Sequence, residues 1–482
     1  MDYKIKFTNM KSLYKYYGIA VLALSASCTD ILEEETFSEL EPETFLATEK
    51  GIRSLLGSAY SSIQVQPGIP QQGIYALSGL SSGEVSSLNG SIEIFYRQLS
   101  DFTWDSNNRH ILGQWDLYYA AIRDANVVLS NIDNGPFSED FKTLITAEAR
   151  FIRGYSYSKL YNLFGPVPLY KDLFNEDLLL PRSTEAEIES FIEQELIFAS
   201  TNLPIRAIEE GRATKGAALG TLCKHYLNTK EWQKSAEKAN EIISLGVYEL
   251  LPDYEEVFSL DNEINDEMVW ALPHVAPDAG NQINALTYPS DFPRPGDLRL
   301  YPVIIFFEDE FVLSFEDNDA RKNLIVTEYT NTAGDEIQLF GNDRSFPAKY
   351  PMDPNGSGDG QGNDIPDIRY SDILLSRAEA LNELNGPVQE SIDLINQVRS
   401  RAGASEISLA DFSKQSLKSF ILDERKREFF WEGKGREDQL RQDVFISKAV
   451  ERGKLAQTFH VLFPIPQINL DANPKLVQNE GY

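Results

Sequence analysis

Five consecutive residues, Gly79-Leu80-Ser81-Ser82-Gly83, match the G-x-S-x-G pattern of serine hydrolases. In those enzymes a buried strand precedes the serine and a helix follows it directly, which exposes the hydroxyl and supplies oxyanion donors. Residues 84–90 are polar and turn-like, so we expect no nucleophilic serine here. The four histidines are not at metal-ligand spacing from one another and are interpreted as packing or surface residues: His110, His225, His274 and His460.

Glu424 and Glu428 lie one helical turn apart, so their carboxylates share one face of a predicted helix. A carboxylate pair can hydrolyse a glycosidic bond if one member is held protonated. Arg425 and Arg427 are adjacent, and guanidinium groups favour the ionised carboxylate. The sequence therefore predicts a structural ion-pair network and no catalytic residue.

An acidic, glycine-rich segment partly matches a calcium-binding loop. The matching residues are Asp353, Asn355, Ser357, Asp359 and Asp364. The last position is Asp rather than the bidentate Glu of the template, and Pro351 and Pro354 oppose an entering helix. We expect a flexible loop, with no metal and no cofactor, and keep calcium as the weaker alternative.

Amphipathic helices are expected to position these segments. Apolar residues recur at helical spacing over Pro42–Ile63, 115–132 and 141–164, and Gly165, Pro166 and Pro168 end the last of these helices. Two later hairpins carry stripes of small residues, one around Ala213–Ile243 and one around Leu374–Ala402, and resemble tetratricopeptide pairs. We predict a mainly α-helical scaffold over about 41–65, 109–245 and 366–445.

Two loop-rich regions interrupt this scaffold, at about 66–108 and 246–362. The first interleaves glycines with aromatic residues. The second is rich in proline and contains three short β-like runs, Met268–Leu272, Ile325–Tyr329 and Glu336–Phe340. Loops mounted on a rigid scaffold commonly carry function, so we predict that both regions bind ligand.

The N-terminus has the pattern of an export signal. Lysines precede a short apolar stretch, Ile19–Leu24, which is too short to cross ~30 Å of hydrocarbon. Ser25-Ala26-Ser27 then leads into Cys28, as in a lipobox, where that cysteine would carry lipid. We predict a lipoprotein signal peptide over 1–27 and one domain over 28–482; an ordinary signal peptide with an incidental cysteine is the alternative.

The chain is strongly acidic. Residues 1–27 carry four lysines and one aspartate, so their removal changes the formal charge from −30 to −33. This balance excludes nucleic acid as a partner, because phosphate binding needs clustered Lys and Arg. Cys223 would be the only cysteine left beside the lipidated Cys28, so no disulfide is expected.

Five segments together resemble the SusD/RagB family. They are the Cys28 leader, Phe151–Leu169 with its Gly165-Pro166-Val167-Pro168-Leu169 end, Ile368–Asn382, Ile421–Arg441, and the closing segment from His460 to Tyr482. Phe429-Phe430-Trp431 and Lys434-Gly435 depart from the family pattern. The resemblance implies a SusD-like fold of tetratricopeptide-like hairpins with a large irregular region that bears short strands.

The resemblance also implies a function. Such proteins are non-catalytic, lipid-anchored in the outer membrane at the cell surface, and deliver oligosaccharides to a SusC-like TonB-dependent transporter. A RagB-like peptide-binding lipoprotein, a secreted glycoside hydrolase and a tetratricopeptide scaffold for other proteins are the alternatives.

Sugar rings stack their C–H faces on aromatic side chains, while polar groups bond their hydroxyls. No motif assigns the contact residues one by one, so the candidates come from the loop-rich regions: Tyr75, Tyr96, Trp104, Asn107, Tyr288, Phe292 and Tyr301. Packing in the core is the alternative for each ring.

Overall fold

The computed structural model describes residues 42–64, 73–88, 93–173, 178–302 and 305–482. The predicted signal peptide and Cys28 lie outside the described residues. Residues 46–482 form one compact unit. The helix expected over Pro42–Ile63 is interrupted: α2 (Pro42–Leu46) ends, and Thr48 caps α3 (Glu49–Ile63) by accepting a hydrogen bond from Gly51 N.

Consecutive long helices pack against one another through the first half of the chain. These are α3, α6 (Arg109–Asn131), α7 (Glu139–Phe164) and α8 (Glu185–Asn202). The predicted end of α7 is confirmed: Gly165 has φ +72°, a conformation that favours glycine, and prolines follow it. The helix predicted from Trp115 begins earlier, at Arg109, because Asn108 caps it by accepting from His110 N.

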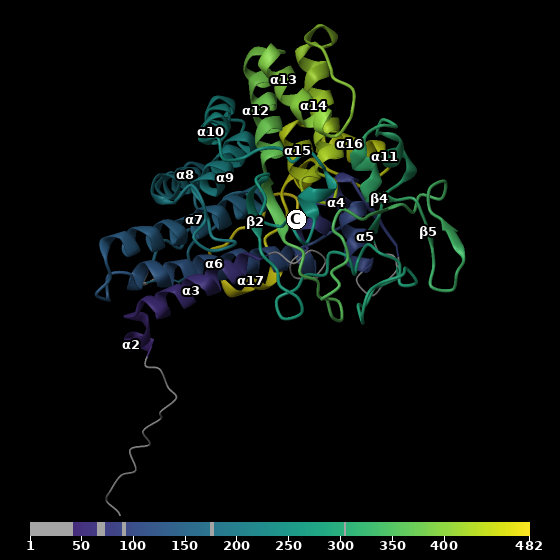
Figure 1. Ribbon diagram of the computed structural model, residues 1–482. Helices are drawn as coiled ribbons and strands as arrows, with labels where there is room; N and C mark the ends of the chain where they lie inside the picture. The colour runs from purple at the N-terminus through teal and green to yellow at the C-terminus, as the bar shows by residue number, and fades with distance from the viewer. Residues whose placement is uncertain (1–41, 65–72, 89–92, 174–177, 303–304) are drawn as a thin grey trace, which may run out of the picture. The chain divides into compact units, whose positions relative to one another are not determined.

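Both predicted hairpins form, as α9 (Lys215–Asn228) with α10 (Trp232–Leu245) and α12 (Tyr370–Asn385) with α13 (Gln389–Arg401). Helix α10 packs against α12 although residues 246–369 intervene, and α14 (Lys414–Glu428) packs against α12 as well (Figure 1). A Cβ atom added at Gly220 would lie 3.0 Å from Ile368 Cδ1, so the small residue permits a close approach. The mainly helical scaffold with an irregular insertion is therefore confirmed.

The insertion between α10 and α12 is closed at its base by two antiparallel strands. Strand β2 (Met268–Leu272) pairs with β8 (Ile365–Arg369), with Met268 opposite Arg369 and Leu272 opposite Ile365. Further out, β4 (Ile325–Val326) pairs with β7 (Phe346–Pro347), and β5 (Glu328–Thr330) pairs with β6 (Glu336–Gln338). The run predicted over Ile325–Tyr329 is thus divided between β4 and β5. A short helix, α11 (Asp309–Leu313), precedes β4 in the sequence.

The first loop-rich region is more helical than expected. It contains α4 (Ile74–Ser82) and α5 (Glu93–Asp101), with β1 (Ser86–Ser87) between them. Strand β1 pairs antiparallel with β3 (Ile305–Phe306) of the insertion. The two regions predicted to bind ligand are therefore joined directly.

The C-terminal segment is fixed against the scaffold. It follows α15 (Gly435–Arg441) and α16 (Phe445–Glu451) and includes α17 (Gln467–Ala472). The hydroxyl of Tyr482 accepts from Trp104 Nε1 at 2.8 Å and donates to Leu462 O at 2.7 Å. Within the described residues, none of the helices has both the length and the apolar character that a membrane crossing requires.

Candidate functional site

Glu424 and Glu428 belong to a buried ion-pair network, as predicted. Glu424 accepts from Arg321, Arg399 and Arg427 at 2.6–2.9 Å, and Glu428 accepts from Arg321, Arg369 and Arg401 at 2.7–3.2 Å. Burial alone would raise the carboxyl pKa values, but the arginines lower that of Glu424 to about 2 and depress that of Glu428 as well. Because both carboxylates stay ionised, neither can act as a general acid.

The G-x-S-x-G residues lack the geometry of a hydrolase. Ser81 lies inside α4 and not at a strand-to-helix turn, and its hydroxyl is buried and donates to Leu77 O. No helix follows directly, because β1 comes next. This agrees with the prediction that Ser81 is not a nucleophile.

The carboxylates of the calcium-like loop point to separate protein partners. Asp353 accepts from Asn355 N and Gly362 N, Asp359 accepts from Gln282 Nε2, and Asp364 accepts from His274 N. Ser357 donates to Asp297 instead. In the part of the chain that the structure describes, no three His, Cys, Asp or Glu side chains are grouped for a metal. The geometry therefore offers no support for the calcium alternative.

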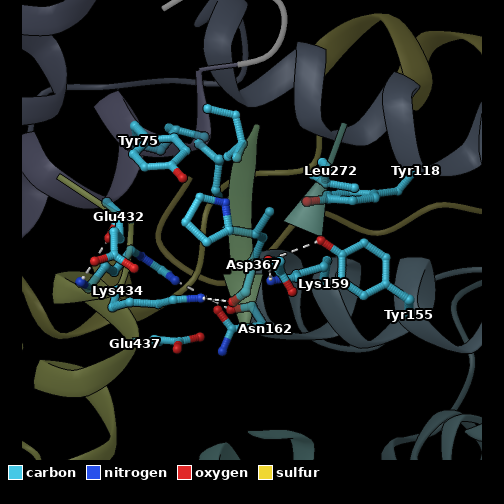
Figure 2. Close-up of a pocket in the computed structure, with 18 residues that line it drawn as sticks. Tyr75, Tyr118, Tyr155, Lys159, Asn162, Leu272, Asp367, Glu432, Lys434 and Glu437 are labelled. Carbon is cyan, nitrogen blue, oxygen red and sulfur yellow. Dashed lines mark hydrogen bonds and ion pairs between the residues drawn. The ribbon is translucent and has the colours of Figure 1, made fainter. Parts of the chain in front are cut away.

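Tyr75 lines an internal cavity between α4, α7, β8 and the segment that leads into α15 (Figure 2). Lys159 Nζ donates to the Asp367 carboxylate at 3.0 Å, and Lys434 Nζ donates to Asp367 O. The cavity measures about 50 Å³, room for one or two water molecules and not for a sugar ring. Tyr75 is only 3% exposed and packs on Trp431.

The candidates around α5 and α6 do not form an open aromatic surface. Tyr96 is fully buried and packs on His110, with ring centroids 4.9 Å apart. Trp104 is 3% exposed and holds the C-terminal Tyr482. Only Asn107 is exposed, in the turn before α6. The sequence shows that these positions are aromatic, but segments distant in the sequence pack on the rings and decide whether they are buried.

Two of the remaining candidates meet in the insertion, and the third, Tyr301, lies apart from them beside Asp359. Tyr288 and Phe292 have ring centroids 5.0 Å apart, and both contact Phe346. Tyr329, which sequence reasoning did not single out, joins them with its ring 5.2 Å from that of Phe292. We call these four rings the insertion cluster. Tyr288 and Phe346 are buried, whereas Phe292 and Tyr329 are half-buried and so retain accessible surface.

Carboxylates accompany the half-buried rings. The Tyr329 hydroxyl donates to Asp291 Oδ1 at 2.8 Å, and the Tyr301 hydroxyl donates to Asp359 Oδ2 at 2.6 Å. The hydrogen bond to Asp359 is the main cause of a raised pKa at Tyr301. Tyr301 is also half-buried. Rings flanked by oriented hydroxyls and carboxylates can stack on a ligand and accept hydrogen bonds from its hydroxyl groups.

Two family models match the chain. One, described as the SusD family, matches residues 281–482, and the other, described as starch-binding associating with outer membrane, matches residues 30–227. A curated relative, SusD-like protein P25 of Formosa agariphila, is 29% identical, and the match covers 95% of this chain and 97% of the relative.

Solved structures share the fold. A SusD superfamily protein from Parabacteroides distasonis superposes with a TM-score of 0.81 at 23% identity, covering 90% of this chain and 99% of its own. A laminarin-binding SusD-like protein superposes with a TM-score of 0.77 at 23% identity, and the match covers 90% of this chain and 100% of that protein.

Proposed function

This chain belongs to the SusD family, and from that premise we propose that it is a non-catalytic, cell-surface carbohydrate-binding protein. It captures oligosaccharides and delivers them to a SusC-like TonB-dependent transporter in the outer membrane. The lipid on Cys28 anchors the protein to the same membrane. The observation that carries the proposal is the pair of family matches over residues 30–227 and 281–482.

The relatives favour a carbohydrate over a peptide. One matching family description names starch binding and outer-membrane association, and one structural neighbour binds laminarin. Both polysaccharides are uncharged, so their recognition relies on ring stacking and hydroxyl hydrogen bonds. The half-buried rings of the insertion offer that chemistry.

We assign the binding role to Phe292, Tyr329 and Tyr301. The first two expose part of their rings beside Asp291, and Tyr301 lies beside Asp359. A pyranose stacked on one ring would gain about 1 kcal/mol beyond its buried area, and its hydroxyl groups would donate hydrogen bonds to the carboxylate oxygens. Asn107, from the first loop-rich region, remains a candidate polar contact because it is exposed. Of the four deeply buried candidates, Tyr288 supports these contacts through its packing on Phe292, whereas Tyr75, Tyr96 and Trp104 pack in other parts of the core.

Affinity gel electrophoresis with starch and laminarin, next to a peptide pull-down, tests the proposal. Tyr329→Ala and Phe292→Ala should each weaken polysaccharide retardation about tenfold, which corresponds to about 1.4 kcal/mol. Tyr329→Phe keeps the ring and should lose less polysaccharide affinity than Tyr329→Ala. Phe420→Ala, a half-buried ring of α14 that packs on Phe412, is the matched control and should bind normally.

Several outcomes would redirect the assignment. Peptide capture without polysaccharide retardation would support the RagB-like alternative, and released oligosaccharides would support a hydrolase. Replacing Cys28 with Ala should move the protein out of the membrane fraction. Failure of a SusC-like transporter from the same cells to co-purify would count against delivery while leaving binding intact.

A further inference from the structure

A large cleft lies apart from the insertion cluster. It opens between α14, α16, α11 and the turn that joins α4 to β1, and its volume is about 700 Å³. Sites for small molecules commonly measure ~300–1,000 Å³. None of the insertion-cluster rings lines it, so it is a separate place on the scaffold.

Two lysines without carboxylate partners line this cleft. Lys426 of α14 packs its ammonium group 4.9 Å from the centre of the Phe311 ring, and Lys448 projects from α16. Burial lowers the pKa of Lys426, attraction to the Glu84 carboxylate opposes that shift, and repulsion from Lys448 adds to it. Considering the described ranges alone, no carboxylate comes within ion-pairing distance of either ammonium group. Two like charges placed close together are stabilised when an anion lies between them.

Buried hydrogen-bonding atoms of the cleft lining also lack partners. Arg425 is fully buried and directs Nε to Asp438 and Nη1 to Asp372, but its Nη2 makes no hydrogen bond. Arg427 Nε is a second such donor. Leaving a buried donor unpaired costs about 1–3 kcal/mol, and more when it is charged. Gln439 Oε1, an acceptor in the same lining, is unpaired as well, so the buried polar atoms around the cleft include both donors and an acceptor.

The acidic residues of the lining leave the inner part basic. Asp438 is bonded by Arg425 and Arg441. Glu84 accepts from Trp431 N, and burial raises its pKa to about 7, so it carries only part of a charge at neutral pH. The others are exposed, where solvent and salt screen their charge: Glu308, Glu310, Asp423 and Glu451.

We propose that this cleft binds a small ligand through its carboxylate group, held by the Lys426 and Lys448 ammonium groups. Charge-assisted hydrogen bonds from these groups would be short and strong. An acidic sugar and a peptide with a free C-terminus carry the same group. The site is distinct from the one proposed for uncharged polysaccharides.

Isothermal titration of the mature protein tests the site with two probes, each paired with an uncharged control. Sodium glucuronate is compared with glucose, and N-acetylglycylglycine is compared with its amide. We expect one acid to bind and its control not to bind. Lys426→Met with Lys448→Met should weaken binding at least tenfold, and Lys448→Met alone should weaken it less. Lys50→Met with Lys238→Met removes the same charge on α3 and α10, outside the cleft, and should have no effect.

The outcomes separate clearly. Preference for glucuronate identifies an acidic sugar, and preference for the dipeptide identifies a peptide terminus. If neither acid binds, if acid and control bind alike, or if the lysine variants bind as the wild type does, the cleft holds only water and the proposal is wrong. Circular dichroism verifies that the variants fold. Laminarin retardation, measured on the same variants, reports independently on the insertion cluster.

Discussion

Replacement of Glu424 by glutamine should destabilise the fold strongly, because three guanidinium groups lose a buried counter-charge. Glu424 is 0% exposed and accepts from Arg321, Arg399 and Arg427. Glutamine keeps the shape but offers one acceptor in place of two, and its NH₂ group would face a guanidinium N–H. The perturbation therefore tests charge and hydrogen bonding while the volume stays constant.

The magnitude follows from the pKa of the carboxyl. Its partners lower the pKa from the ordinary 4.5 to about 2. That gap corresponds to about 3 kcal/mol of stability at neutral pH, and since the side chain is fully buried no allowance for solvent is needed. Breaking a buried ion pair by removing one partner typically costs about 3–5 kcal/mol, which agrees.

Urea unfolding followed by circular dichroism at several pH values measures this cost. The folded pKa lies below the unfolded pKa, so the contribution of Glu424 is complete above about pH 4.5 and is lost as the pH falls towards 2. The difference between wild type and variant should therefore be about 3 kcal/mol at pH 7 and about half of that near pH 3.

Glu237→Gln is the matched control, because Glu237 is exposed on α10. This substitution should lower the free energy of unfolding by less than about 0.5 kcal/mol. A Glu424→Gln cost below about 1 kcal/mol at pH 7 would refute the stabilising role of this carboxylate. So would a difference between wild type and variant that stays constant from pH 7 to pH 3, because the loss would then not arise from the ionised form.

Two further expectations concern buried groups elsewhere. Tyr482→Phe leaves Trp104 Nε1 and Leu462 O without their hydrogen-bond partner, which should cost about 1–3 kcal/mol of local stability. Amide hydrogen exchange across residues 453–482, measured by mass spectrometry, should become faster. Unchanged protection would contradict the anchoring role of Tyr482. Burial raises the pKa of the Cys223 thiol to about 11, so iodoacetamide at pH 8 should alkylate the native protein more than roughly 100-fold more slowly than the urea-unfolded protein, and comparable rates would show that the thiol is accessible.

The helical frame could be predicted because its signals are local. Gly165 with the prolines that follow it ends α7, and the stripe of small residues around Gly220 specifies a face for close packing. Strand β2 has the bounds predicted for it, since its short apolar run follows two acidic residues and ends at a proline. The split at Thr48 was missed, although a capping threonine was a readable signal.

The partners of buried charges could not be predicted. Arg369 bonds Glu267, Glu428 and Glu432, which lie far away in sequence and meet only after the insertion has closed. The exposure of the aromatic rings could not be predicted either, because a tryptophan can pack in a hydrophobic core or stack on a sugar. Trp104 became an anchor for the chain end, while Tyr329, in a predicted strand, kept an accessible ring.

The antiparallel pairing of β2 with β8 has a consequence for how such a chain can diversify. Since the two strands meet at the root, they return the chain to the start of α12 whatever the length of the segment between Pro273 and Asp364. Lengthening a closed loop costs only about 0.6 kcal/mol for each doubling. The outer segments of the insertion can therefore change at little cost, provided that Arg321, which neutralises Glu424 and Glu428, and β3, which pairs with β1, are kept.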